Sequence, residues 1–191
     1  MLPVFWIDIV LSYIPNLITV LRVVAAPLLI LLLKYGNYEL ALLLFLIAGI
    51  SDGLDGYIAK RFNVQSQFGA MLDPVADKIL LVSCFVMLTL LGHLPFWLLV
   101  IVSFRDVLIV GGYLVLVMLK VTVQMAPSIV SKLNTVCQIC LVGLVLAELA
   151  GWVALGGVVD LLIVVVVVTT LISGIHYVWL WGFGKDGIAK G

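Results

Sequence analysis

The sequence of 191 residues has little charge, little cysteine and no excess of either sign of charge. Only 10% of its residues are charged, against about 25% in an average soluble domain, and 65% are hydrophobic. Ten basic residues balance ten acidic ones, so no net charge attracts an acidic partner such as nucleic acid. Three cysteines are too few for a disulfide framework. These shortages exclude a soluble globular domain, a disordered chain and a nucleic-acid-binding module, and they leave an integral membrane protein.

Apolar runs interrupted by charged residues and prolines predict how the chain crosses the membrane. A spanning helix needs about 20 mostly apolar residues. Six runs meet this requirement: residues 16–34, 38–59, 69–91, 95–119, 132–151 and 157–181. We therefore predict an all-α polytopic membrane protein with six transmembrane helices in a single domain, residues 1–191. The aromatic residues of segment 1–14 predict an N-terminal interfacial segment along the membrane surface.

The placement of lysine and arginine predicts the orientation of the chain in the membrane. With six spans both termini lie on one side. Five of the ten basic residues lie there too, namely Lys60, Arg61, Lys120, Lys185 and Lys190, and Lys132 and Lys78 lie near that edge. The opposite side has Lys34 and His93. We predict that both termini and the loops at 60–68 and 120–131 are cytoplasmic, in a bacterial inner membrane.

An acidic cluster lies where membrane helices are predicted. Four of the ten acidic residues fall in one 26-residue window: Asp52, Asp55, Asp73 and Asp77. A charged side chain at membrane depth costs at least ~2.5–3.5 kcal/mol on insertion scales. Clustered carboxylates repel one another, and burial disfavours their ionised form, so a positive charge must hold them together. The few basic residues nearby in sequence favour a bound divalent cation as that charge.

The spacing of the aspartates supports a shared metal site. Asp52 and Asp55 are three residues apart and Asp73 and Asp77 are four apart, so each pair shares one helix face. Two facing helices would then present four carboxylates to one volume. All-oxygen anionic ligands suit Mg²⁺, Mn²⁺ or Ca²⁺ rather than zinc. Four carboxylates can hold two ions about 3.5–4 Å apart, an arrangement suited to phosphoryl chemistry.

Small residues and two cations accompany the aspartates. Gly56, Ala59 and Gly69 would let a bulky phosphate ligand approach the backbone, although small residues also let membrane helices pack closely. Lys60 and Arg61 follow at the predicted cytoplasmic edge. They are candidate partners for a diphosphate, and orientation signalling is the alternative explanation.

Residues 52–77 read D-G-L-D-G-Y-I-A-K-R-F-N-V-Q-S-Q-F-G-A-M-L-D-P-V-A-D. This segment resembles the signature of the CDP-alcohol phosphatidyltransferases, D-x2-D-G-x2-A-R-x8-G-x3-D-x3-D. The aspartates, the two signature glycines and the alanine match at the family spacing, whereas Lys60 stands where the family has arginine. Lysine keeps the charge but loses bidentate phosphate geometry, so either Lys60 or Arg61 takes that role.

The resemblance extends along the chain and favours one branch of the family. Residues 14–27, I-P-N-L-I-T-V-L-R-V-V-A-A-P, look like the first-helix motif of the phosphatidylglycerophosphate synthase and cardiolipin synthase branch. Residues 131–138, S-K-L-N-T-V-C-Q, resemble the fifth-helix entry of that branch. R-D-V at 105–107 is similar to membrane-embedded cardiolipin synthases, whereas the glycerophosphate enzymes more typically have R-E. Phosphatidylglycerol is therefore the favoured acceptor, and glycerol 3-phosphate is the alternative.

The resemblance also implies a fold and a reaction. The fold has six transmembrane helices around a cytoplasm-facing polar cavity and is commonly homodimeric. The reaction transfers a phosphatidyl group from CDP-diacylglycerol to an alcohol and releases CMP. The implied metal ligands, for two Mg²⁺ or Mn²⁺ ions, are Asp52, Asp55, Asp73 and Asp77, with Asp77 also the catalytic base. The implied CDP and diphosphate site comprises Gly56, Ala59, Lys60, Arg61 and Gly69.

The fourth and fifth spans contain candidate acceptor contacts. Arg105 lies about ten residues into the fourth span, where an unpaired charge is costly. We predict that it binds the acceptor phosphate, and a buried ion pair with a cavity aspartate is the alternative. Asp106 points about 100° away on a helix and is expected to be a less direct partner. Lys132 opens the fifth span as a second candidate, with an interfacial anchor as its alternative role.

The first span contains candidate nucleotide contacts, because Asn16, Thr19 and Arg22 share a helix face at i, i+3 and i+6. Arg22 pairing with an aspartate is the alternative.

A different class of protein, a divalent-cation transporter, also keeps aspartates in the membrane. That class predicts repeated halves with interrupted helices, and residues 120–191 contain no counterpart of the acidic cluster.

Overall fold

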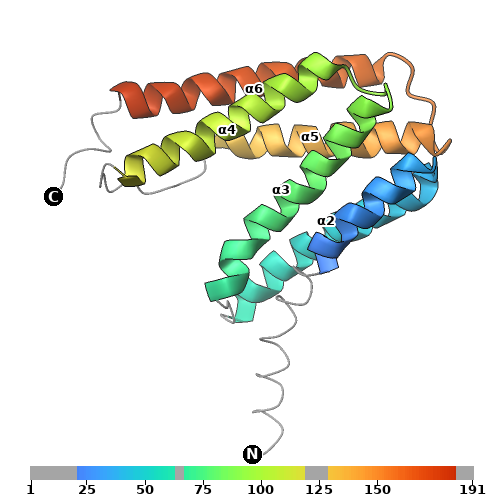
Figure 1. Cartoon of the computed structure of the whole chain (residues 1–191), viewed down its shortest axis with the longest axis horizontal. Helices are drawn as coiled ribbons and strands as arrows, with labels where there is room; N and C mark the ends of the chain where they lie inside the picture. The colour runs from blue at the N-terminus through green and yellow to red at the C-terminus, as the bar shows by residue number, and fades with distance from the viewer. Residues whose placement is uncertain (1–20, 63–66, 119–128, 184–191) are drawn as a thin grey trace, which may run out of the picture. The chain divides into compact units, whose positions relative to one another are not determined.

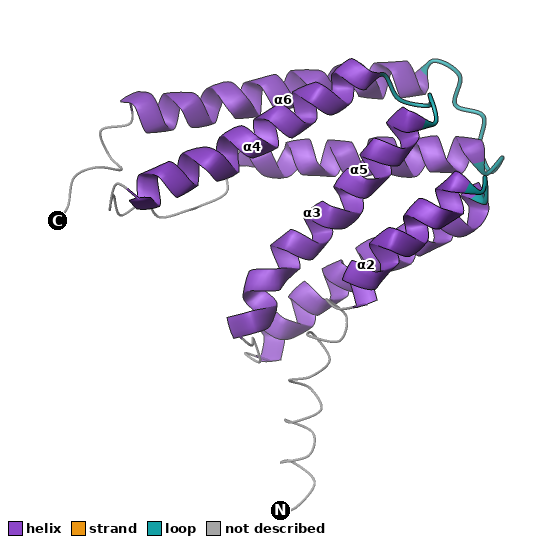
Figure 2. Ribbon diagram, viewed as in Figure 1, coloured by secondary structure: helices purple, strands orange, loops and turns teal. Residues whose placement is uncertain are grey.

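The computed structural model describes residues 21–62, 67–118 and 129–183, without the side chains of 52–62, 67–77, 113, 114, 116, 117 and 180–183. The described residues form helices joined by turns, with no strand among them (Figure 2). A helical segment over residues 21–34 precedes the helices α2 (Tyr38–Phe62), α3 (Gln67–Leu90), α4 (Phe96–Met118), α5 (Ile129–Leu149) and α6 (Val158–Phe183) (Figure 1). The predicted all-α class is confirmed for these residues. The interfacial segment 1–14 lies outside them.

The helix boundaries lie within three residues of the predicted apolar runs. The largest differences occur at the predicted loop 60–68 and at the fifth span. α2 continues to Phe62, so Lys60 and Arg61 belong to its last turn and not to a loop. α5 ends at Leu149, two residues before the predicted end, because Gly151 takes a φ of 76° that no helix can contain.

Glycine ends two of the helices by the same mechanism. After residues 21–34, Gly36 has a φ of 72°, the N–H of Asn37 donates to the Leu32 carbonyl at 2.9 Å and the N–H of Gly36 donates to Leu33 at 3.1 Å. The same pair of bonds surrounds Gly151 after α5. This Schellman arrangement satisfies carbonyls that the helix end leaves open. It fixes where the chain leaves each helix, since side chains with a Cβ disfavour this φ.

The chain forms two compact units, one of residues 1–91 and 145–154 and one of residues 92–144 and 155–191. In the first unit the buried apolar side chains include Leu29, Leu33, Leu42, Phe85 and Leu88. In the second unit α4 packs against α6, and the buried apolar side chains include Leu98, Val102, Leu141, Val142 and Val166. The single domain of residues 1–191 stays a prediction.

Large apolar side chains are also exposed along every described helix, among them Ile47, Val107, Leu161 and Ile175. Soluble monomers rarely expose contiguous apolar patches beyond a few hundred Å². Among the described residues, Ile129–Leu149 and Val158–Trp179 are long and apolar enough to cross a membrane, and Tyr38–Ser51 and Lys78–Leu90 are shorter apolar helices. These features fit a membrane protein, while six spans and their orientation stay predictions.

Candidate functional site

The two aspartate pairs lie at similar distances along α2 and α3 from the connection between these helices. Asp52 and Asp55 lie ten and seven residues before the end of α2, about 15 and 10 Å at 1.5 Å per residue. Asp73 and Asp77 lie six and ten residues after the start of α3, about 9 and 15 Å. Five Cα–Cα steps of 3.8 Å join the two helices, so their ends lie within about 19 Å of each other. Both pairs are therefore equally far from the connection between the helices.

The chemistry of the donor set suits a hard divalent ion, because carboxylate oxygens are the ligands that Mg²⁺ and Mn²⁺ favour. The side chains of the four aspartates lie outside the described part of the structure, as do those of Gly56, Ala59, Lys60 and Arg61 in α2 and Gly69 in α3. Among the residues that are described, no group of three His, Cys, Asp or Glu side chains could hold a metal. The metal site therefore stays a prediction, supported by backbone placement.

Arg22 is buried in the first unit, where the residue is 3% exposed. Its burial agrees with a helix face turned inward, as the i, i+3, i+6 pattern predicts. Asn16 and Thr19, the other two residues of that pattern, lie outside the described residues. Buried arginines in membrane segments are costly and commonly mark ligand or ion sites.

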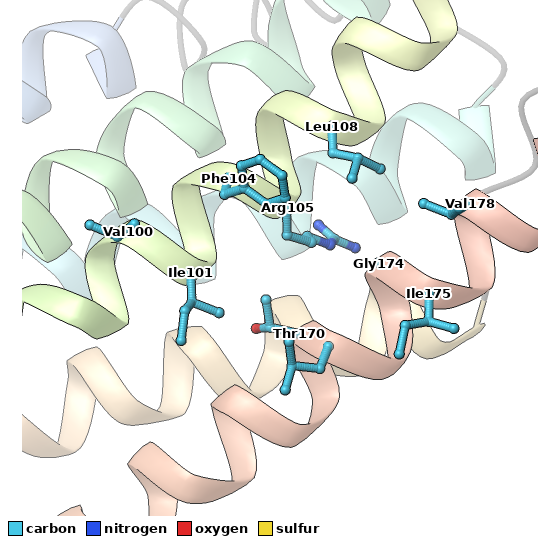
Figure 3. A pocket seen from close by; sticks show the side chains of 10 residues that line it. Val100, Ile101, Phe104, Arg105, Leu108, Thr170, Gly174, Ile175 and Val178 are labelled. Carbon is cyan, nitrogen blue, oxygen red and sulfur yellow. The ribbon is translucent and has the colours of Figure 1, made fainter.

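Arg105 is the tenth residue of α4 and is 6% exposed. Its Nε donates to Ser173 Oγ at 3.2 Å, and its Nη2 donates to the same oxygen at 2.6 Å. Nη2 also donates to Ser131 Oγ, and Nη1 donates to Asp106 Oδ1 at 2.9 Å. Figure 3 shows the side chain directed from α4 toward α6. Three helices, α4, α5 and α6, thus hold one guanidinium in place.

Asp106 is the ion-pair partner of Arg105, so the prediction that it is a less direct partner is wrong. Adjacent helix positions do point about 100° apart. The long arginine stem spans that angle, and Nη1 reaches Oδ1 at 2.9 Å while Nη2 faces Ser131 and Ser173. The two side chains are only 7% and 14% exposed. A buried pair of this kind is stable only when further hydrogen bonds surround it, which the serines supply.

Within the described residues, one N–H donor of Arg105 has no acceptor. A guanidinium has five N–H donors, one on Nε and two on each Nη. Within the described residues, Ser173, Ser131 and Asp106 occupy four of these donors, and one N–H of Nη1 remains. This remaining donor suits an anionic oxygen, because hydrogen bonds from a charged donor to an anion are about twice as strong as neutral ones.

Two buried amides on α5, one helical turn apart, were not recognised from the sequence. Asn134 Oδ1 accepts hydrogen bonds from Thr169 Oγ1 at 2.9 Å and Thr170 Oγ1 at 2.8 Å. Asn134 Nδ2 and both amide atoms of Gln138 have no hydrogen-bond partner in the described part of the chain. Each unsatisfied buried group costs about 1–3 kcal/mol. The polar spacing within 131–138 was the available signal.

Lys132 lies next to Ser131 in sequence but on a different face of α5. Its side chain is exposed, whereas Ser131 bonds to Arg105. The structure therefore brings Ser131, Ser173 and Arg105 together and leaves Lys132 outside this cluster. Its acceptor role stays a prediction.

The model of the CDP-alcohol phosphatidyltransferase family matches residues 12–172, a range that includes both aspartate pairs and Arg105. The chain belongs to the CDP-alcohol phosphatidyltransferase family. The resemblance based on residues 52–77 is thereby confirmed, and so is the prediction that this phosphatidyltransferase is an enzyme.

Relatives of this phosphatidyltransferase have names of two kinds. A Drosophila melanogaster protein named probable cardiolipin synthase (CMP-forming) is 38% identical over 147 residues, 69% of this chain and 46% of that protein. A Mycobacterium tuberculosis (strain H37Rv) protein named probable phosphatidylglycerophosphate synthase is 33% identical over 170 residues, 85% of this chain and 78% of that protein. A Rickettsia typhi protein named CDP-diacylglycerol–glycerol-3-phosphate 3-phosphatidyltransferase is 31% identical over 168 residues, which cover 85% of this chain and 93% of that protein.

The phosphatidyltransferase spans about half the length of the Drosophila relative. The names of the relatives are of two kinds, cardiolipin synthase and phosphatidylglycerophosphate synthase, and only the Rickettsia name prints an acceptor, glycerol 3-phosphate. Family membership therefore establishes the class of transfer and leaves the acceptor to the chemistry of the site.

Proposed function

We propose that this enzyme transfers a phosphatidyl group from CDP-diacylglycerol to the hydroxyl of an anionic glycerol-type acceptor and releases CMP. The observation that supports the proposal is that the two aspartate pairs lie equally far, along α2 and α3, from the connection between these helices. Phosphatidylglycerol is the favoured acceptor, which makes cardiolipin the product. Glycerol 3-phosphate is the second candidate, supported by the names of the Mycobacterium and Rickettsia relatives.

The proposed reaction is a single displacement at phosphorus. Two Mg²⁺ or Mn²⁺ ions on Asp52, Asp55, Asp73 and Asp77 would stabilise charge on the diphosphate. Asp77 accepts the proton of the acceptor hydroxyl, and the hydroxyl oxygen forms a bond to the phosphorus that carries diacylglycerol. The bond from that phosphorus to the CMP oxygen breaks, and CMP leaves with the electron pair. A carboxylate is a weak base for an alcohol, so positioning of the reactants supplies much of the rate.

The donor would be bound in the first unit, by residues of three helical segments. Small residues would leave room for cytidine diphosphate, and Lys60 or Arg61 would pair with the diphosphate. The proposed nucleotide and diphosphate contacts are Gly56, Ala59, Lys60, Arg61, Gly69, Asn16, Thr19 and Arg22. Burial of Arg22 supports its part in this set.

The acceptor phosphate would be bound by the remaining N–H of Arg105, with Lys132 as a second cation. Ser131 and Ser173 hold the guanidinium plane, so the N–H that would bind the phosphate is positioned before the acceptor arrives. We further propose a homodimer in the cell membrane with both termini and the active site on the cytoplasmic side. Basic residues near the ends of the predicted spans support this orientation.

An assay of the purified enzyme tests the reaction and the acceptor together. CDP-diacylglycerol is supplied with Mg²⁺ or Mn²⁺ and with each acceptor separately, and the mass of the lipid product is measured. We expect CMP release that a chelator abolishes and added Mg²⁺ restores, with cardiolipin formed from phosphatidylglycerol. If neither acceptor supports CMP release, the proposed function is refuted.

The variant Asp77→Asn tests the proposed base. We expect CMP release to fall by at least ~100-fold, in line with the contribution of a positioned acid or base, while expression and thermal unfolding stay unchanged. Glu39→Gln is the matched control, because Glu39 is an exposed carboxylate in the first turn of α2. Activity retained in Asp77→Asn would defeat the role assigned to Asp77.

A further inference from the structure

A pocket lies where α4 and α6 begin, in the second unit. Its lining comes from residues 92–95 and Trp97 on one side and from four residues in the first two turns of α6 on the other. Its volume is about 520 Å³, which is within the range of small-ligand sites. The apolar lining residues include Leu94, Ile163 and Val164, and the polar ones are His93, Trp97 and Asp160. The pocket therefore combines apolar walls with a carboxylate, an imidazole and an indole.

Asp160 makes this pocket negative. Its side chain is exposed, and no lysine or arginine is among the described residues that line the pocket. Trp97 lines the same pocket from α4 and is 51% exposed. The face of an indole attracts an ammonium ion, as a carboxylate does. The helix dipole alone favours an acidic residue in a first turn, but it does not explain the indole that lines the same pocket from the neighbouring helix. Together the two side chains select for a cation.

The lengths of the two helices place this pocket at the level of lipid headgroups. α4 has 23 residues and α6 has 26, which give about 35 and 39 Å at 1.5 Å per residue. The hydrocarbon core of a bilayer is about 30 Å thick, so helices of this length that cross it begin in the headgroup region. Val164 lines the pocket and is 57% exposed, so the pocket is continuous with the apolar outer surface of α6. A lipid can therefore place its headgroup in the pocket and its acyl chains outside it.

We propose that this pocket, hereafter the headgroup pocket, binds the ammonium group of a zwitterionic phospholipid, with Asp160 as the counter-ion and the Trp97 indole against the ammonium. The imidazole of His93 can donate a hydrogen bond to the phosphate of the same headgroup. The inference goes beyond the proposed phosphatidyl transfer, because the bound lipid is neither donor nor acceptor. Trp97 lies eight residues, about 12 Å along α4, before Arg105, and no aspartate of the proposed metal site lines the pocket.

Photolabelling of the full-length enzyme tests whether such a lipid occupies the headgroup pocket. Phosphatidylethanolamine with a diazirine at the glycerol end of one acyl chain is added to the enzyme in phosphatidylglycerol nanodiscs, whose lipid has no ammonium group. Labelled peptides are identified by mass spectrometry. We expect label on the peptides that contain Trp97 and Ile163, and absence of label from both would overturn the inference. Labelling requires no turnover, so this result is independent of whether the enzyme releases CMP.

Substitutions test the two side chains that select the ammonium. We expect Asp160→Asn to reduce the label on the Trp97 peptide at least fivefold, whereas Asp160→Glu, which keeps the charge, should change it less than twofold. Glu39→Gln is the matched control, because Glu39 is an exposed carboxylate that does not line the pocket. Equal labelling of Asp160→Asn and Glu39→Gln would overturn the inference.

The indole has a matched control as well. We expect Trp97→Leu to reduce the label on the Ile163 peptide at least threefold. Trp152→Leu should change it less than twofold, because Trp152 is also 51% exposed but does not line the pocket. Equal labelling of these two variants would remove the indole from the site and contradict the inference.

Competition identifies what the headgroup pocket recognises. We expect unlabelled phosphatidylethanolamine to displace the label at a concentration at least tenfold lower than N-acetyl phosphatidylethanolamine, which has the same acyl chains and phosphate but no ammonium. Equal displacement by the two lipids would mean that any surrounding lipid fills the pocket, which overturns the inference. Displacement by free ethanolamine at the concentration at which phosphatidylethanolamine acts would assign the pocket to a small amine and would overturn it too.

Discussion

Replacing Ser173 by alanine tests whether α6 holds the guanidinium of Arg105. Ser173 is fully buried, and its Oγ accepts two hydrogen bonds from this cation, at 3.2 and 2.6 Å. The substitution removes one oxygen, leaves almost no cavity and keeps the bonds to Ser131 and Asp106. The decrease in the free energy of unfolding therefore measures what it costs to leave two N–H groups of Arg105 without this acceptor.

The magnitude follows from the burial of these groups. Hydrogen bonds to charged groups contribute about 1.5–3 kcal/mol in soluble proteins, and interhelical bonds measured within membranes average about 0.6 and reach about 1.7 kcal/mol. Here one oxygen serves two donors of a guanidinium that is 6% exposed, so water cannot replace it. We expect a loss of about 1.5–2 kcal/mol, which lowers the Tm of a chain of this size by roughly 3–8 °C.

Thermal unfolding of the purified protein in one detergent, followed by circular dichroism, measures this effect. Ser103→Ala is the matched control, because Ser103 is a half-buried serine of α4 that makes no hydrogen bond within the described residues. We expect the control to lose less than about 0.5 kcal/mol. Equal Tm values for the two variants would show that Ser173 does not hold Arg105, and the argument for a prepositioned acceptor site would fail.

Two further substitutions examine the same unit. Arg105→Ala should raise the KM for the acceptor at least tenfold and the KM for CDP-diacylglycerol much less, measured by CMP release at varied concentrations of each; equal increases would indicate a purely structural ion pair. Gln138→Met removes a buried amide whose two polar atoms have no partner in the described residues, and each such group costs about 1–3 kcal/mol, so we expect the Tm to rise by a few degrees. A lower Tm for Gln138→Met would contradict this account of Gln138.

Hydropathy and local spacing predicted the helices closely, since apolar run length is a local property of the chain. The errors occurred where one residue decides a boundary, as at Gly151, whose positive φ ends α5 earlier than the apolar run ends. Lys60 and Arg61 were assigned to a loop because they are charged, yet both belong to the last turn of α2. Charge marks the end of an apolar run, whereas a helix continues until its backbone geometry changes.

The spacing of Asp52, Asp55, Asp73 and Asp77 was sufficient to identify the family, because a fixed pattern of residue types along two helices is already a chemical description of the site. Burial of Arg22 and of Arg105 could also be anticipated, since both lie inside apolar runs. These features depend only on residues close together in sequence.

Only the tertiary structure revealed which groups surround Arg105 and which residues line the headgroup pocket. Ser173 is 68 residues from Arg105, Thr170 is 36 residues from Asn134, and α4 and α6 meet only through packing. The apolar runs of these helices do not encode which faces meet, because many rotations of a uniformly apolar helix satisfy the same hydropathy. The choice among them depends on side-chain packing and on hydrogen bonds between helices, which exist only once the helices are together.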